Sequence, residues 1–271
     1  MPLSPLVRSY DQFIVDLDGT VYVGDELTPG AVEAIEQLRG AGKGVAFVTN
    51  NPRLSGEDYV RKLWKLGLRA SLADVVTVGG ATQHLLAETR TGRTAFVIGS
   101  PAIHQHVSEA GLKVLNGTDL ASRAEVVLVA GTDQVDYSDL RTAALAVRRG
   151  ADFLATSRDP TYPMPDGMWP GTGAILAAVE VASEREAATI GKPEPQLMIT
   201  AIERLGEGKA LVIGDRLDTD GEAAARAKLD FALVLTGGAS REEALAAKDH
   251  KPVAVAETLA ELVNAAGPSL A

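Results

Sequence analysis

Short, continuous apolar runs recur along the chain and alternate with segments of helical periodicity. A run without polar alternation suits a strand buried on both faces, which is typical of parallel sheets covered by helices. The sequence therefore predicts an α/β fold with a mostly parallel sheet. The runs lie at residues 13–15, 45–48, 75–78, 95–98, 126–129, 153–155, 211–213 and 232–235.

The segments between these runs carry signals for helix starts. Thr28 precedes a proline and then a run of helical spacing, so we expect it to cap a helix. Ser55 followed by Asp58 is typical of a capping box and predicts a second helix start. We interpret Gly171 and Gly173 as close packing at the start of a third helix.

Polar clusters follow three of the apolar runs directly. DLDGT follows residues 13–15, TNN follows 45–48 and GDRLDTD follows 211–213. Ligands of open α/β sheets bind beyond the carboxyl ends of the strands, so we expect one shared site. The chain between the second and third clusters must leave this domain and return. We predict a core domain of residues 1–90 and 186–271 and an inserted α/β domain of residues 91–185.

The first cluster places two carboxylates, Asp16 and Asp18, on the same side of a strand that stays extended. Two unit charges about 5 Å apart at an effective dielectric of about 20 repel by roughly 3 kcal/mol, so the pair needs a cation, a proton or solvent. Asp215 and Asp220 of the third cluster supply further oxygen ligands of the kind that magnesium prefers.

Each cluster alone also fits a simpler interpretation. Asp-x-Asp-Gly is common in turns, and GDRLDTD fits a solvated acidic loop. A calcium-binding loop is excluded because Val21 and Leu27 stand where glycine and glutamate are required. Thr49 and Asn50 fit an ordinary turn, and Lys192 fits a surface lysine. The joint occurrence favours a site in which a hydroxyl, a backbone N–H group and an ammonium hold phosphate oxygens.

Composition limits the partners and the compartment. The net charge of -10 argues against nucleic acid as the main partner, since no basic stripe is present. The absence of cysteine excludes disulfides and thiolate metal sites, and the four histidines form no ligand cluster. No apolar run is long enough to span a bilayer and no signal-peptide pattern is present, so we expect a cytoplasmic protein without a membrane partner. A homodimer is compatible with the sequence.

The motifs DLDGT, TNN, GKPEP and GDRLDTD, in this order, resemble the four signature motifs of the haloacid dehalogenase (HAD) superfamily of phosphotransferases. The segment from DGTVYVGDELTPG to VTNNP, with PGTGAILAAVE ahead of IGKP, resembles subfamily IIA, the NagD-like and p-nitrophenylphosphatase-type enzymes. This resemblance implies a Rossmann-like core with helices on both faces and a large inserted α/β cap of the C2 type.

The resemblance also implies roles for individual residues. Asp16 would attack phosphorus as the nucleophile, and Asp18 would act as general acid and then as general base. Mg²⁺ would be held by Asp16, the backbone carbonyl of Asp18 and Asp215, with Asp220 orienting the ligands. The transferring phosphoryl group would be bound by Thr49, Asn50, Asn51 and Lys192.

The implied activity is magnesium-dependent hydrolysis of a small phosphate ester. The substrate classes are nucleotides, pyridoxal phosphate, sugar or polyol phosphates and phosphoglycolate, and the product of the first step is an aspartyl-phosphate. A phosphomutase or phosphotransferase of the same fold, a receiver-like phosphoaspartate domain and a non-catalytic ligand-binding protein are the alternatives. A dehalogenase is disfavoured because Asp18 supplies an acid and metal site that such chemistry does not need.

Two segments depart from the pattern of the family. Ser157-Arg158-Asp159 stands where related sequences usually show Asn-x-Asp, and the TVGG segment at residues 77–80 replaces a threonine-serine pair. Both departures concern substrate recognition rather than the reaction. Arg158 is a candidate for binding an anionic group of the substrate, with a solvated loop arginine as the alternative. Arg53 and Arg216 are weaker candidates of the same kind.

Overall fold

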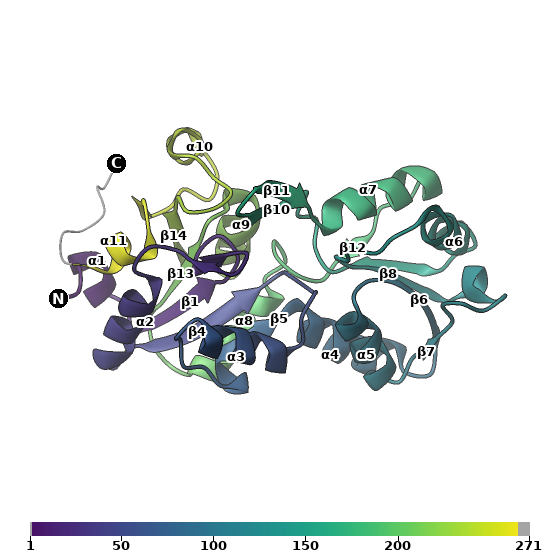
Figure 1. Ribbon diagram of the computed structural model, residues 1–271, viewed down its shortest axis with the longest axis horizontal. Helices are drawn as coiled ribbons and strands as arrows, with labels where there is room; N and C mark the ends of the chain where they lie inside the picture. Colours follow the sequence, from purple (N-terminus) through teal and green to yellow (C-terminus); the bar gives the residue numbers. More distant parts are fainter. Residues whose placement is uncertain (1, 265–271) are drawn as a thin grey trace.

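The chain forms two α/β units that lie side by side in a computed structural model, which describes residues 2–264 (Figure 1). The first unit is built on a parallel six-stranded sheet with strand order β15-β14-β13-β1-β4-β5. The strands are β1 (Gln12–Asp16), β4 (Gly44–Thr49), β5 (Val75–Thr77), β13 (Ala210–Gly214), β14 (Asp230–Val234) and β15 (Ala254–Ala256).

Helices cover both faces of this sheet, and successive strand residues serve opposite faces. Phe13 and Val15 pack in one apolar cluster with α1, α2, α3 and α11, whereas Ile14 between them packs with α8, α9 and α10. Because both faces are buried, the strands need the unbroken apolar runs seen in the sequence. The helices are α1 (Pro5–Arg8), α2 (Ala31–Gly40), α3 (Gly56–Lys65), α8 (Gln196–Leu205), α9 (Glu222–Arg226), α10 (Arg241–Ala246) and α11 (Leu259–Val263).

The second unit is the cap, built on a parallel five-stranded sheet with strand order β12-β9-β8-β6-β7. One face packs against α5 (Pro101–Glu109) and the end of α4 (Val78–Arg90), and the other against α6 (Tyr137–Arg148) and α7 (Thr172–Ser183). The strands are β6 (Thr94–Ile98), β7 (Lys113–Val114), β8 (Val126–Val129), β9 (Asp152–Ala155) and β12 (Ala188–Thr189). The fold class predicted from the sequence is confirmed.

Two antiparallel hairpins complete the fold. In the cap, β10 (Thr161–Met164) pairs with β11 (Gly167–Pro170), and this hairpin lies above the junction of the two units (Figure 1). Its turn reaches the core hairpin of β2 (Tyr22–Val23) and β3 (Glu26–Leu27), where a Cβ at Gly24 would lie 2.8 Å from Pro165 Cδ. Shorter turns are η1 (Leu72–Asp74), η2 (Ala121–Arg123) and the π-turn η3 (Leu217–Gly221).

The structure corrects three local expectations. Strand β12 pairs with β9 of the cap sheet, so the chain returns to the core after Thr189 and not at residue 186; a two-residue edge strand gives too weak a sequence signal to place. Strand β5 ends at Thr77 because the Thr77 side chain accepts a hydrogen bond from Gly80 N and caps α4. The β2–β3 and β10–β11 hairpins were not predicted, because their strands lie outside the apolar runs of the sequence.

Of the two predicted helix caps, Ser55 is confirmed and Thr28 is wrong. Ser55 accepts a hydrogen bond from Asp58 N at 3.2 Å and begins α3, as expected. Thr28 does not cap α2, because its hydroxyl donates to the carbonyls of Thr20 and Val21, and the helix begins after Gly30 instead. None of the described helices is long and apolar enough to cross a membrane.

We expect Ser55→Ala to lower the free energy of unfolding by about 1 kcal/mol, since it removes the acceptor at the first turn of α3. Urea unfolding followed by circular dichroism measures this loss. Ser108→Ala is the matched control, because its hydroxyl donates to the His104 carbonyl near the end of α5 and caps no helix start. Equal losses in both variants would contradict the capping role.

Candidate active site

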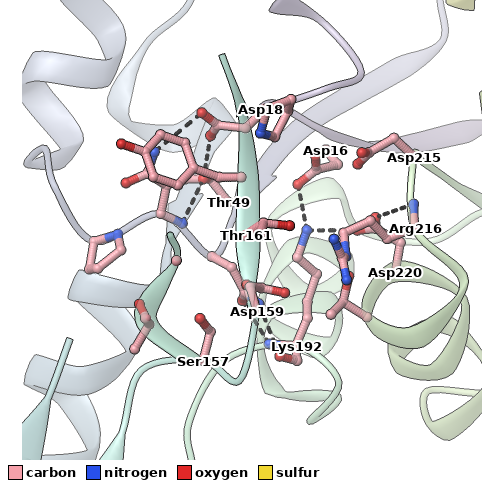
Figure 2. A pocket seen from close by; sticks show the side chains of 18 of the residues that line it. Asp16, Asp18, Thr49, Ser157, Asp159, Thr161, Lys192, Asp215, Arg216 and Asp220 are labelled. Carbon is pink, nitrogen blue, oxygen red and sulfur yellow. Dashed lines mark hydrogen bonds and ion pairs between the residues drawn. The ribbon is translucent and has the colours of Figure 1, made fainter. Parts of the chain in front are cut away.

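The ends of β1, β4 and β13 deliver the acidic and polar clusters to a single cavity between the core and the cap. Figure 2 shows Asp16 beside Asp215 and Lys192, with Asp18 above Thr49. Residues of the cap line the same cavity from the loop after β9, from β10 and from the start of α7. The lining includes Asp159, Thr161, Tyr162 and Thr172 of the cap.

Lys192 lies at the centre of the buried charges. Its Nζ atom donates hydrogen bonds to Asp16 Oδ1 and, at 2.6 Å, to Asp220 Oδ1. Lys192 is only 3% exposed. Burial alone would lower the pKa of Lys192, but the charges of Asp16 and Asp220 outweigh burial and raise the pKa above its usual value. Lys192 therefore stays positively charged beside the carboxylate of Asp16.

Three buried carboxylates converge beside this lysine. Ligand atoms of Asp16, Asp215 and Asp220 all lie within 4.8 Å of one another. Burial raises the pKa of Asp16 well above its usual value despite Lys192, and burial together with Asp220 raises the pKa of Asp215 to about 7. One ammonium thus leaves this group short of positive charge. Hard carboxylate oxygens at this spacing fit a divalent cation such as Mg²⁺.

Glycine residues allow Asp215 to sit against the end of β1. Gly238 N donates to Asp215 Oδ2 at 2.5 Å, and a Cβ at Gly237 would lie only 2.1 Å from the same oxygen. Gly19, which has a φ of +91°, would place a Cβ 2.5 Å from it. The glycine of DLDGT is therefore needed for close approach to Asp215 as well as for its backbone conformation.

Asp18 lines the cavity but has different partners from Asp16, because β1 ends at Asp16 and the extended geometry does not continue. Its Oδ1 accepts from Asn51 Nδ2 at 3.2 Å and its Oδ2 from Thr49 Oγ1 at 3.3 Å. Burial raises the pKa of Asp18, while the charge of Lys62 and the Asn51 hydrogen bond oppose the shift. A carboxyl group with a raised pKa suits proton transfer.

The TNN segment acts through its side chains in a way that the sequence did not indicate. Thr49 Oγ1 also accepts from Asn51 N, so the hydroxyl holds the turn that carries Asn51. The Asn50 side chain is bonded to the backbone of Lys192 and to Asp159. Asn50 and Asn51 thus hold other site residues with their side chains. Direct binding of phosphate by this segment stays a prediction.

The arginine candidates differ in their surroundings. Arg158 binds Glu180 at 2.8 Å and the Ala187 carbonyl at 2.9 Å, and it does not line the cavity. The expectation that Arg158 reaches the substrate is therefore not supported, and its neighbour Asp159 lines the cavity instead. A Cβ at Gly173 would lie 2.3 Å from the Arg158 carbonyl, so the glycines at the start of α7 pack tightly against this loop, as predicted.

Arg53 and Arg216 both line the cavity, but each is held by an aspartate. Arg53 Nε donates to Asp133 at 3.1 Å, and its guanidinium lies 4.2 Å from the centre of the Tyr162 ring. Arg216 donates to Asp218 at 2.7 Å. Tyr162 was not among the residues predicted for the site. The PDG turn at residues 165–167 is the signal from which its hairpin could have been found.

The acidic ends of the core strands meet a buried lysine beneath an inserted α/β cap. This arrangement defines the class of the protein, which is a capped phosphotransferase with a doubly wound core. Comparisons with known proteins agree. Residues 13–113 match the model of the family described as haloacid dehalogenase-like hydrolase, and residues 189–262 match a second model described as HAD-hydrolase-like.

Relatives match over nearly the whole chain. A D-glycerol 3-phosphate phosphatase of Mycobacterium tuberculosis is 36% identical over 262 residues, covering 96% of this chain and 73% of the relative. The crystal structure of a glycerol phosphate phosphatase from the same organism, in complex with magnesium, superposes with a TM-score of 0.86 at 36% identity over 96% of this chain and 78% of that one. NagD from Escherichia coli K-12 gives 0.80 at 26% identity, over 93% and 98% of the two chains.

The chain belongs to the haloacid dehalogenase-like hydrolase family. The predicted NagD-like resemblance is confirmed, and so is the enzyme class, that of the phosphatases.

We expect Gly19→Ala to abolish phosphatase activity, because the new methyl group would displace Asp215 from the carboxylate cluster. Gly42→Ala is the matched control: its φ of +74° imposes a similar backbone cost, but nothing lies within 4 Å of the added atom. Urea unfolding should show a loss of about 1 kcal/mol in Gly42→Ala for the strained backbone, and a larger loss in Gly19→Ala because its methyl group also meets Asp215. Full activity in Gly19→Ala would contradict the close packing against Asp215.

We also expect the metal-free protein to become less stable as pH rises from about 4 to about 7. The pKa of Asp215 is raised to about 7 in the folded state from 3.8, so its folded form binds the proton more tightly than its unfolded form. Its contribution to stability is therefore fully present below about pH 4 and is lost as the pH rises towards about 7.

Thermal unfolding in EDTA at pH 5 and pH 7.5 measures this decline, with Asp215→Asn as the reference that lacks the titrating group. Added Mg²⁺ should raise the melting temperature more at pH 7.5, where the carboxylates are ionised. The same pH dependence in wild type and Asp215→Asn would be evidence against it.

Proposed function

We propose that this enzyme hydrolyses a small polyol or sugar phosphate with Mg²⁺ through an aspartyl-phosphate on Asp16. The observation that carries the proposal is the meeting of Asp16, Asp215 and Asp220 within 4.8 Å beside Lys192. Bound Mg²⁺ would supply positive charge to the carboxylates and to the phosphate oxygens. Asp16, Asp215 and the backbone carbonyl of Asp18 would hold it, while Asp220, bonded to Lys192 and to Arg216 N, would orient the group.

The residues divide the reaction into two displacements. Asp16 attacks phosphorus, the phosphorus-oxygen bond to the leaving group breaks, and Asp18 gives its proton to the departing oxygen. Asp18, now ionised, takes a proton from a water molecule that attacks the phosphorus, which releases phosphate and restores Asp16. Lys192 and Thr49 supply charge and hydrogen bonds that position the phosphoryl group, which is the main demand of this chemistry.

The cavity favours a compact, uncharged leaving group. Both lining arginines, Arg53 and Arg216, are already bound to aspartates, so neither is poised for a second anionic group. Thr161, Tyr162 and Thr172, which carry uncharged hydroxyl groups, line the same cavity. Similarity to a glycerol phosphate phosphatase supports a polyol phosphate above the other substrate classes that the family resemblance allows.

The alternatives fit the site less well. A receiver-like domain would leave the cap and the Asp18 acid without a role, and a phosphomutase would need a second phosphoryl acceptor in the same small cavity. A homodimer, the absence of a nucleic-acid partner and the cytoplasmic location stay predictions from the sequence.

We expect Asp16→Asn to abolish turnover while leaving folding and Mg²⁺-dependent stabilisation by phosphate largely intact, because the amide keeps the shape but not the nucleophilic oxygen pair. Phosphate release from glycerol phosphate, sugar phosphates and p-nitrophenyl phosphate, with Mg²⁺ or EDTA, measures the activity. Asp119→Asn, at an exposed position that does not line the cavity, is the control. Turnover near wild type in Asp16→Asn would disprove the nucleophile assignment, and an inert wild type would disprove the function.

A further inference from the structure

The side-chain amide of Asn50 makes a paired contact with the backbone of the catalytic lysine. Asn50 Oδ1 accepts from Lys192 N at 2.7 Å, and Asn50 Nδ2 donates to Lys192 O at 2.9 Å. The amide thus satisfies both backbone groups of one residue, as a neighbouring strand would. Gly191 makes this approach feasible, because a Cβ there would lie 2.4 Å from Asn50 Oδ1.

The same amide reaches the cap. Asn50 Nδ2 also donates to Asp159 Oδ2 at 2.9 Å, and Asp159 belongs to the loop that follows β9 of the cap sheet. A primary amide has two N–H donors, and here one serves the lysine backbone and the other serves the cap. Asp159 is held in turn by the start of α7, since its carbonyl oxygen accepts a hydrogen bond from Gly173 N at 2.8 Å.

We propose that Asn50 is a positioning residue through which the closed cap fixes the catalytic lysine. With the cap in place, Asp159 orients the Asn50 amide, and the amide holds the backbone of Lys192 so that its ammonium faces Asp16. Without the Asp159 contact, the amide loses one of its bonds and the lysine backbone loses an oriented partner. This inference rests on the proposed function, because it assigns a role in phosphoryl transfer.

The position of the lysine matters because the phosphoryl group is held by charge and geometry. A displacement of about 1 Å in a catalytic group can lower the rate by about 100-fold. Lys192 cannot compensate by rotating freely, since it is buried between Asp16 and Asp220. The coupling therefore affects the chemical step more than substrate binding, so the loss appears in kcat and not mainly in KM.

Steady-state kinetics of Asn50→Ala, Asp159→Ala and the double variant, with p-nitrophenyl phosphate and Mg²⁺, test the proposal. We expect each single variant to lower kcat, by about 10- to 100-fold for Asn50→Ala and less for Asp159→Ala, with little change in KM. The double variant should be no worse than Asn50→Ala, because Asp159 acts through Asn50. Asp159→Asn, which keeps an acceptor oxygen, should recover kcat to within about threefold of wild type.

Asp133→Ala is the matched control, because it breaks a different contact between core and cap, the Arg53–Asp133 pair, without touching Lys192. In a double variant, the fold losses in kcat of Asp133→Ala and Asn50→Ala should multiply, because the two contacts act independently. The proposal would be overturned if the fold losses in kcat of Asn50→Ala and Asp159→Ala multiplied in the double variant. It would also be overturned if Asp159→Ala raised KM at constant kcat.

An unfolded Asn50→Ala variant and an inert wild type also have defined consequences for the proposal. If Asn50→Ala does not fold, as judged by circular dichroism, the Asp159 variants decide: loss of kcat in Asp159→Ala with recovery in Asp159→Asn supports the proposal, and equal kcat in both overturns it. An inert wild type would overturn the proposed function itself, which separates that failure from a failure of the coupling.

Discussion

The repulsion among three buried carboxylates is the constraint on which the rest of the site depends. Asp16, Asp215 and Asp220 gather their oxygens within 4.8 Å, and burial together with neighbouring carboxylates raises the pKa values of Asp16 and Asp215. Such a group is stable only beside positive charge. Lys192 supplies one charge from within the chain, and the remaining deficit favours a hard divalent cation, whose charge would also be available to phosphate oxygens.

The second organising feature is that one core loop contacts the carboxyl ends of three cap strands. Pro52 O accepts from Ser100 after β6, Arg53 binds Asp133 after β8, and Asn50 donates to Asp159 after β9. The cap sheet thus presents its strand ends to the cavity, as the core sheet does. Since ligands of parallel sheets bind at strand ends, a cavity between two such sheets can bind the phosphoryl group on one side and the leaving group on the other.

The sequence was informative where a residue's role depends on its own segment. Continuous apolar runs identified the longer strands of both parallel sheets but not β7, β12 or β15. The motif order identified the shared site, because it depends on the parallel-sheet topology. It failed where the deciding partner is distant. Thr28 looked like a helix cap, but its hydroxyl binds the carbonyls of Thr20 and Val21. Arg158 was a candidate for substrate binding, with a solvated loop arginine as the alternative, but Glu180 of α7 holds it. No local signal linked Asn50 to Lys192 across 142 positions.

The two units differ in how much change they can accept. In the core, a methyl group added at Gly19, Gly191 or Gly237 would lie within 2.5 Å of a site atom, so the reaction machinery has no room to vary. In the cap, Met168 and Trp169 of the β10–β11 hairpin are 48% and 40% exposed, and their replacement would disturb few buried contacts. The packing around the carboxylates of the core therefore leaves less room for substitution than the exposed hairpin of the cap does.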